Sequence, residues 1–466
     1  MSLRPSFAAS ILAALAVGNP LAAADGPDAA GARLVGAALV QSRAHDKLAY
    51  LTDRIGHRLS GSAALERAVQ WAADEFRRDG MDRVWTEKVL VPHWVRGPIA
   101  VRVVSPIETG LVALALGGSV STPAAGIQAE LIEFSSLDEL KAAGEAVRGK
   151  IVLFNKPIAA GFDEEHGYGS AVGLRVDGAS AAARQGAVAM LLRSLGTADF
   201  RLPHTGAMRY ATDAPKIPAA AVAAEDALML HRLLAAGERV RVQLALEASE
   251  LPDAESANVL AELRGRERPA EVVLLAAHLD SWDVGQGAID DGAGCAIVME
   301  TMRLLQQQGA APRRTIRAVL YTNEENGTRG GKAYVEAHRG ELALHVAAIE
   351  SDSGGAAPQG FGVSAGPGGA EAVREIAREL AGLGAGDVVP RGGGADIGPL
   401  KEFGVPLLSL RQDSTHYFDY HHTPADTLDK VRPAELDLNV AALAWLAWML
   451  AEREAPLPRL VPEPAR

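Results

Sequence analysis

The sequence predicts an α/β protein: a mixed, mostly parallel sheet flanked by helices, with an inserted, mainly β segment. First, apolar or β-branched runs recur at 271–277, 315–322, 345–350 and 405–410, separated by helix-like stretches. Such runs are typical of parallel strands buried on both faces. Second, acids and histidines follow these runs closely. Third, shorter β-like pieces between about 107 and 249 are separated by Gly, Pro and Ser turns, which indicates an insertion.

Length and composition place the chain among ordinary globular proteins. Its 466 residues suffice for two domains or for one domain with a large insertion, and hydrophobic residues make up 48%. The formal net charge of −12 argues against a surface that binds nucleic acid or anionic membranes. Cys295 is the only cysteine, so no internal disulfide can form.

The first 24 residues have the pattern of a secretory signal peptide. Arg4 precedes an apolar stretch from residue 7 to 17, and small residues at 22–24 offer a cleavage site. The stretch is short for a membrane span, although an uncleaved anchor is the alternative interpretation. We therefore expect a secreted or periplasmic protein that has no membrane segment once the signal is cleaved.

The remaining elements follow in chain order. Ser62 is expected to cap a helix that ends near Gly80, and a strand follows at 84–91. Later helices are expected at 293–308, 331–338, 370–383 and 436–451, where apolar residues recur at helical spacing. The predicted organisation is a signal peptide (1–24), a catalytic domain in two parts (25–106 and 250–455), an insertion (107–249) and a flexible tail (456–466).

Metal-type ligands follow four of the predicted strands. In an open α/β sheet, ligands bind beyond the carboxyl ends of the strands, so these side chains should meet at one rim. Glycines at 285, 287, 292 and 294 let the backbone approach an ion closely. The expected ligands are two imidazoles and three carboxylates: His278, Asp290, Glu325, Asp352 and His422.

Two acidic pairs are expected to divide their tasks. Asp290 is expected on the metal, and Asp291 is expected to cap or support the following helix. In the pair Glu324 and Glu325, adjacent residues point to different sides, so one can bind metal while the other acts as a general base. Asp280 can support the imidazole of His278.

This donor set indicates zinc, with cobalt or manganese as substitutes, because it offers nitrogen and oxygen without thiolates. Two ions would each take one histidine and one terminal carboxylate, and Asp290 would bridge them. Such a pair can generate hydroxide and stabilise the oxyanion of an attacked amide. The sequence therefore predicts a two-metal hydrolase.

Several motifs resemble the two-zinc exopeptidases of the bacterial zinc aminopeptidase type, and within that family the carboxypeptidase Q (plasma glutamate carboxypeptidase) branch. They are GHRLSGS at 56–62, HLDSWDVGQGAIDDGAG at 278–294, NEEN at 323–326, ESDSG at 350–354 and YHHTPADT at 420–427. The resemblance extends over nearly the whole mature chain.

The resemblance implies that the insertion is a protease-associated lid, and that Asp290 bridges two zincs. One zinc would be held by His278 and Asp352, and the other by Glu325 and His422. Glu324 would be the general base for a metal-bound hydroxide, and Asp280 would lie behind His278. It also implies a cis peptide bond after Asp290, hydrolysis of dipeptides and short peptides, and a homodimer.

The group that polarises the scissile carbonyl is left open. Many relatives have a tyrosine immediately before the last histidine ligand, whereas this chain has His421 there and Tyr420 one residue earlier. The helper is His421, Tyr420 or the metal alone. His416 and Asp396 are further candidates for the substrate pocket, and His204 is a weaker one.

Three alternatives are weighed against a carboxypeptidase or dipeptidase. An aminopeptidase of the same fold differs only in the peptide end that it recognises. A receptor-like binding protein would lack metal ligands, whereas all five are present here. Single-zinc glutaminyl cyclases share the fold but lack the lid domain.

Overall fold

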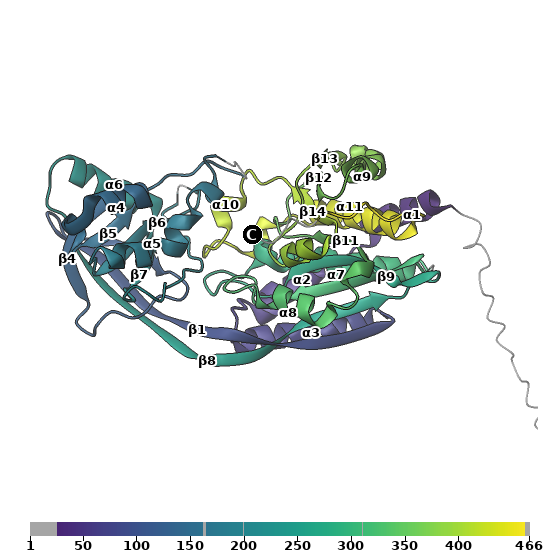
Figure 1. Cartoon of the computed structure of the whole chain (residues 1–466), viewed down its shortest axis with the longest axis horizontal. Helices are drawn as coiled ribbons and strands as arrows, with labels where there is room; N and C mark the ends of the chain where they lie inside the picture. Colours follow the sequence, from purple (N-terminus) through teal and green to yellow (C-terminus); the bar gives the residue numbers. More distant parts are fainter. Residues whose placement is uncertain (1–25, 162–164, 199, 310, 462–466) are drawn as a thin grey trace, which may run out of the picture.

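The computed structural model describes residues 26–161, 165–198, 200–309 and 311–461 (Figure 1). The expected signal peptide lies outside the described residues. Within the described part of the chain, the strands form one 14-stranded mixed sheet. Along its main path the order is β13-β12-β14-β11-β9-β10-β8-β4-β5-β6-β7-β3. The predicted α/β class is confirmed.

Four parallel strands form the centre of the catalytic half. β9 (Arg268–His278) pairs in parallel with β10 (Arg314–Tyr321) and with β11 (His345–Glu350), and β11 pairs in parallel with β14 (Leu407–Gln412). These are the four strands that the apolar runs predict. β12 (Pro358–Ser364) and β13 (Asp387–Val389) extend the sheet beyond β14.

Both faces of this sheet are covered, which explains the unbroken apolar runs. Leu275 of β9 belongs to the large core beneath α1, α3, α7 and α11, whereas the adjacent Leu274 belongs to a smaller core on the side of α8. The helices are α1 (Pro27–Gln41), α2 (Ala44–Tyr50), α3 (Ala63–Arg78), α7 (Ala293–Gln307), α8 (Arg329–His338), α9 (Gly369–Ala377) and α11 (Pro433–Glu452).

The helix boundaries agree with the local signals. The Ser62 hydroxyl accepts a hydrogen bond from the Leu65 amide at 3.1 Å, which confirms the predicted cap of α3. The helix expected at 370–383 is divided, because α9 gives way to a 3-10 turn over Arg378–Leu383. α11 is long and apolar enough to cross a membrane, yet 72% of its apolar window is buried inside the protein.

A long two-stranded ribbon joins the catalytic half to the insertion. β1 (Arg83–Ser105) and β8 (Arg241–Leu263) pair antiparallel over most of their length, and both units attach to this ribbon (Figure 1). In the insertion, parallel strands β4–β7 and antiparallel β3 are flanked by α4–α6 and pack around two apolar clusters, one of which also includes Leu59 and Trp282 of the catalytic half. Their bounds are β3 Ala113–Ala115, β4 Ile127–Phe134, β5 Ile151–Phe154, β6 Ala189–Arg193, β7 Ala219–Val222, α4 Leu137–Ala143, α5 Val172–Arg184 and α6 Ala224–Ala235.

The structure differs from the expected flexible tail at residues 456–461. Leu457 is buried, and the Leu460 amide donates to the Gly404 carbonyl at 3.0 Å. The Arg459 guanidinium donates to backbone carbonyls of Leu342, His345 and Phe403. These bonds offset the conformational entropy that a proline-rich tail loses on docking. Residues 462–466 lie outside the described part.

Candidate metal centre

The five expected ligands meet at the rim formed by the carboxyl ends of the central strands. His278 is the last residue of β9, and Glu325 and Asp352 follow β10 and β11 within four residues. Asp290 lies in the turn that precedes α7, and His422 follows the short helix α10 (Tyr417–Tyr420). The structure thus gathers residues that are up to 144 positions apart in the chain, counted from His278 to His422.

The ligand atoms form two groups that share Asp290. In the first group, Nε2 of His278 lies 3.2 Å from Oδ1 of Asp290 and 3.5 Å from Oδ1 of Asp352. In the second, Nε2 of His422 lies 3.1 Å from Oδ2 of Asp290 and 2.9 Å from Oε2 of Glu325. The two oxygens of Asp290 therefore face different groups.

Both histidines are held with Nε2 facing the group. Nδ1 of His278 lies 3.0 Å from the backbone carbonyl of Asp280, and Nδ1 of His422 lies 3.3 Å from that of Thr205. A carbonyl can only accept, so each Nδ1 carries the hydrogen and each Nε2 keeps its lone pair. A hydrogen bond of this kind fixes the tautomer that a metal requires.

The carboxylate of Asp280 orients the two glutamates. It accepts hydrogen bonds from the backbone amides of Glu324 at 3.0 Å and of Glu325 at 3.3 Å, whereas its Oδ1 lies 3.8 Å from Nδ1 of His278. Glu325 is further fixed by the Trp282 amide, which donates to its Oε1 at 3.1 Å. Asp280 therefore supports the turn after β10, and its backbone carbonyl supports His278.

Asp291 and Asp426 support the turn that carries Asp290. Asp291 accepts from the Gly294 amide at the start of α7 and from the His278 amide, both at 3.0 Å. This confirms the supporting position expected for Asp291. Asp426 accepts from the amides of Ala288 and Ile289 at 2.8 and 2.7 Å. The peptide bond after Asp290 is cis, as the resemblance implies.

The electrostatics of this cluster fit a bound cation. Burial raises the pKa of Glu325 to about 7, and burial together with neighbouring carboxylates raises the pKa of Glu324 and Asp352 above the usual range. Oδ2 of Asp290 is buried and accepts no hydrogen bond from the described residues. The donor set of imidazole nitrogens and carboxylate oxygens fits zinc. Zinc would supply the positive charge that keeps these carboxylates ionised.

The weaker candidates are divided between this site and the surface. His421 is buried, with Nε2 at 3.3 Å from Oδ2 of Asp290. Asp396 is also buried, beside Glu350, whose carboxylate accepts from the Asp396 amide at 3.4 Å. His416 is largely exposed and pairs with Asp419, and the Tyr420 ring lies 5.5 Å from the Lys430 ammonium. The expectation that His416 and Tyr420 contribute to the substrate pocket stays a prediction.

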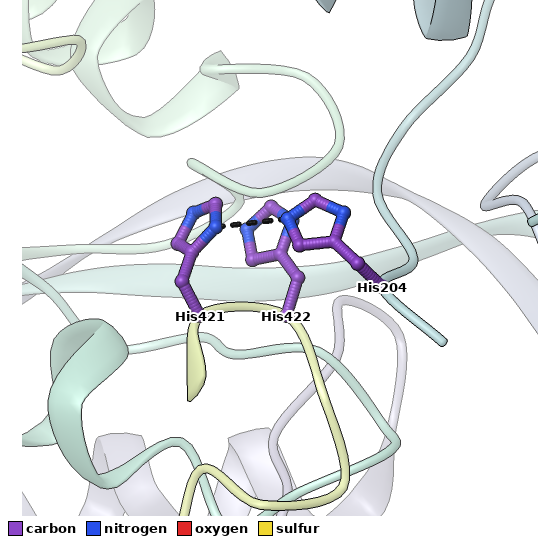
Figure 2. A group of neighbouring side chains, drawn as sticks. All are labelled: His204, His421 and His422. Atoms are coloured by element: carbon purple, nitrogen blue, oxygen red, sulfur yellow. Dashed lines mark hydrogen bonds between the residues drawn. The ribbon is translucent and has the colours of Figure 1, made fainter. Parts of the chain in front are cut away.

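A third histidine approaches the site from the insertion. His204, His421 and His422 form a buried group (Figure 2), and Nε2 of His204 lies 3.0 Å from Nδ1 of His421. Burial and the neighbouring rings lower the pKa of His204 and of His421 well below the ordinary value. In the sequence, the only signal for His204 is its place in the segment PHTG at residues 203–206.

Sequence reasoning also missed Arg58, which is fully buried in the GHRLSGS segment. Its guanidinium donates to the carbonyls of Leu279, Gln286 and Gly287, which belong to the turn between His278 and Asp290. The motif itself was the available signal, but a single sequence does not reveal which loop such a segment contacts.

Comparisons with known proteins agree with this geometry. Residues 258–447 match peptidase family M28. Carboxypeptidase Q from Mus musculus is 38% identical over 419 residues, which cover 90% of this chain and 88% of the mouse protein. Carboxypeptidase Q from Homo sapiens is also 38% identical, over 90% of this chain and 87% of the human protein.

Solved structures show the same fold. A peptidase M28 precursor from Shewanella amazonensis superposes with a TM-score of 0.91 at 39% identity, covering 94% of this chain and all of that one. A zinc aminopeptidase from Bacillus subtilis superposes with a TM-score of 0.66 at 20% identity, covering 88% and 95% of the two chains. The chain therefore belongs to peptidase family M28 and is a metallopeptidase.

Proposed function

We propose that this protein is a zinc-dependent exopeptidase that hydrolyses the peptide bond of dipeptides and short peptides, with two zinc ions per chain. The observation that carries the proposal is the shared carboxylate of Asp290, whose two oxygens face two separate histidine–carboxylate groups. Similarity to carboxypeptidase Q over 90% of the chain supports the choice of an exopeptidase.

Each proposed zinc site has one histidine and one terminal carboxylate. His278 and Asp352 would hold one ion, Glu325 and His422 would hold the other, and Asp290 would bridge them. When bound, the ions would polarise the scissile carbonyl and lower the pKa of the attacking water. Cobalt or manganese could substitute, because both accept the same nitrogen and oxygen donors.

Glu324 is the proposed general base. It is half-buried at the rim, and its backbone amide is fixed by Asp280 at 3.0 Å. Its raised pKa brings the carboxyl closer to neutrality, where a base can take a proton from water and pass it to the leaving amine. Glu325 beside it is turned to His422 instead, so the pair divides binding and proton transfer.

The insertion is proposed to act as a lid. The Trp282 ring, next to the metal-site turn, packs directly against Gly117 of the insertion, where a Cβ would approach within 2.0 Å. The Thr205 carbonyl contacts His422, as described above. These contacts support an insertion that closes over the site and limits access to short peptides.

Amino-acid release from one dipeptide in four forms tests this function. The forms are free, N-acetylated, C-amidated and doubly blocked, each assayed with zinc and after chelation. We expect chelator-sensitive cleavage that is lost on blocking the C-terminus, because the carboxypeptidase Q relatives cover most of the chain. Cleavage that survives C-amidation but not N-acetylation would instead show an aminopeptidase, and no cleavage of any form would refute the peptidase proposal.

Export is a separate proposal that rests on residues 1–24. Arg4, the apolar stretch and the small residues before Asp25 support cleavage of a signal peptide. N-terminal sequencing of the protein recovered from periplasm and culture medium tests it: a mature chain that begins near Asp25 is expected, and an intact Met1 would contradict cleavage.

A further inference from the structure

The insertion contributes a hydrogen bond to the histidine that precedes His422. His204 is fully buried, and its Nε2 lies 3.0 Å from Nδ1 of His421 (Figure 2). The other ring nitrogen of His204, Nδ1, is buried and has no hydrogen-bond partner among the described residues. The group that Nε2 of His421 faces, Oδ2 of Asp290 at 3.3 Å, determines where the hydrogen atoms lie.

A hydrogen bond between two imidazole nitrogens needs one donor and one lone pair. If His421 donated, its Nε2 would carry a lone pair 3.3 Å from Oδ2 of Asp290, and two acceptors would face each other. Nδ1 of His204 has no partner in either arrangement, so its cost does not distinguish them. A doubly protonated His204 would add a buried charge. The favoured state therefore has the hydrogen on Nε2 of His204, donated to Nδ1 of His421.

This assignment fixes the neighbouring ring as well. With Nδ1 accepting, a neutral His421 carries its hydrogen on Nε2, which lies 3.3 Å from Oδ2 of Asp290 and thus faces the proposed metal groups. The His421 ring is packed by the rings of Tyr168, Tyr417 and Phe418, with centroids 5.0–5.3 Å away. Its orientation is therefore fixed on several sides, and an N–H donor is directed into the site.

We propose that His421 donates its Nε2 hydrogen to the oxygen of the scissile carbonyl, and that His204 is the positioning residue that holds His421 in the required tautomer. This inference rests on the proposed peptidase function. A donor directed at an oxygen that gains negative charge stabilises the transition state more than the bound substrate. The insertion would thus complete the catalytic site as well as cover it.

The backbone of the same segment supports this assignment. The Thr205 amide donates to the His422 carbonyl at 3.0 Å, and Nδ1 of His422 donates back to the Thr205 carbonyl at 3.3 Å. His422 has φ of +59°, a region that costs energy for a residue other than glycine. Residues 204 and 205 therefore hold both consecutive histidines, one through the side chain and one through the backbone.

Three variants separate positioning from packing. His204→Phe keeps a ring of similar size but removes the donor, His204→Gln keeps an N–H at a similar reach, and His421→Leu removes the direct donor. We expect His421→Leu to lower kcat about 100-fold, as removal of an oxyanion donor does elsewhere. His204→Phe should lower kcat roughly 10-fold with little change in KM, as loss of an orienting partner does. His204→Gln should restore most of that loss.

The double variant distinguishes an effect through His421 from a separate one. Because His204 acts through His421, His204→Phe in the His421→Leu background should cause no further loss of kcat. Zinc content should equal that of the wild type in all variants. Additive losses, a fall in zinc content, or wild-type kcat in His204→Phe would each overturn the positioning role.

A spectroscopic measurement tests the tautomers without turnover. In the zinc-loaded protein labelled with ¹⁵N-histidine, the ring resonances of His421 are assigned as those that disappear in His421→Leu. In the wild type, these resonances should show a hydrogen on Nε2 and none on Nδ1. In His204→Phe the same ring should become a mixture of tautomers. A hydrogen on Nδ1 of His421 in the wild type would overturn the inference while leaving the proposed peptidase intact. Absence of any peptide hydrolysis by the wild type would instead refute the proposed function and the catalytic part of this inference.

Discussion

The buried Arg58 offers a sharp test of what holds the metal-site turn. Its side chain is fully buried, and its guanidinium donates to four backbone carbonyls at 2.8–3.0 Å. Those carbonyls belong to Gly56, Leu279, Gln286 and Gly287. A planar fork with five donors suits several carbonyls at once, which an apolar side chain or an ammonium cannot match.

The cost of Arg58→Met can be worked from these contacts. The bonds to Leu279 and Gly287 are buried, but the Gly287 carbonyl also accepts from the Gly292 amide at 3.1 Å, so the substitution leaves only the Leu279 carbonyl without a partner. At about 1–3 kcal/mol for an orphaned group, the free energy of unfolding should fall by about 2 kcal/mol. The loss of a cation near Asp280, Asp291 and Asp426 adds to this cost by removing a compensating charge. A fall of this size is a large fraction of a typical total.

The assay combines urea denaturation with zinc analysis of the dialysed protein. Arg58→Met should shift the unfolding midpoint downward and weaken zinc retention roughly 10-fold, because the turn between two ligands is no longer fixed. The unfolding midpoint and zinc retention of Arg58→Lys should lie between those of the wild type and Arg58→Met, since one ammonium cannot reach four carbonyls.

Arg314→Met is the matched control. Arg314 is equally buried and donates to the carbonyls of Ala451, Arg453 and Glu454, but it begins β10 at the end remote from the rim. The substitution Arg314→Met should destabilise the fold and leave zinc retention unchanged. Equal zinc loss in both variants would refute a local role for Arg58, and an unchanged midpoint in Arg58→Met would refute the stability argument.

Two further predictions concern the base and the pH dependence. Glu324→Gln should retain zinc and the fold but lower kcat at least about 100-fold, because only proton transfer is removed; near-native turnover would rule out Glu324 as the base. Burial lowers the pKa of His345 to about 4, and the ring accepts from the Tyr334 hydroxyl at 2.8 Å. The unfolded chain binds this proton near pH 6.5 and the folded chain does not, so stability falls as pH drops from 6.5 to 4, by about 3 kcal/mol at most. Urea titrations of His345→Gln at several pH values should lack this fall in stability between pH 6.5 and 4. A pH profile of stability identical to that of the wild type would contradict the role of His345.

The residues at the rim of the sheet could be predicted from the sequence, because the signals that place them there are local. Each apolar run predicts a strand, and the residue after each run is placed by the common direction of parallel strands. His278 and Asp352 come together for this reason alone, although 74 positions separate them, from 278 to 352. The different directions of Glu324 and Glu325 also follow locally, since neighbouring residues at a strand end face different sides; their separate roles remain a prediction.

The contacts between the insertion and the catalytic half could not be derived in this way. His204 meets His421 across 217 positions, and neither strand periodicity nor helix periodicity predicts which loop of one unit contacts a loop of the other. Arg58 is a comparable case, because its partners are backbone carbonyls 221–229 positions away. Backbone acceptors have no signature in the sequence, so a buried cation that depends on them cannot be distinguished from an exposed one.

The arrangement of the histidines implies that the insertion and the metal-binding half form one functional unit. His422 takes its zinc-competent tautomer from the Thr205 carbonyl, and His421 takes its orientation from His204. Both supports lie in a loop of the insertion, whereas both histidines belong to the last rim loop of the catalytic half. An opening of the insertion that broke these bonds would release both imidazoles together. If the insertion closes over a substrate and His421 polarises its carbonyl, as proposed above, then closure and the alignment of His421 are the same event.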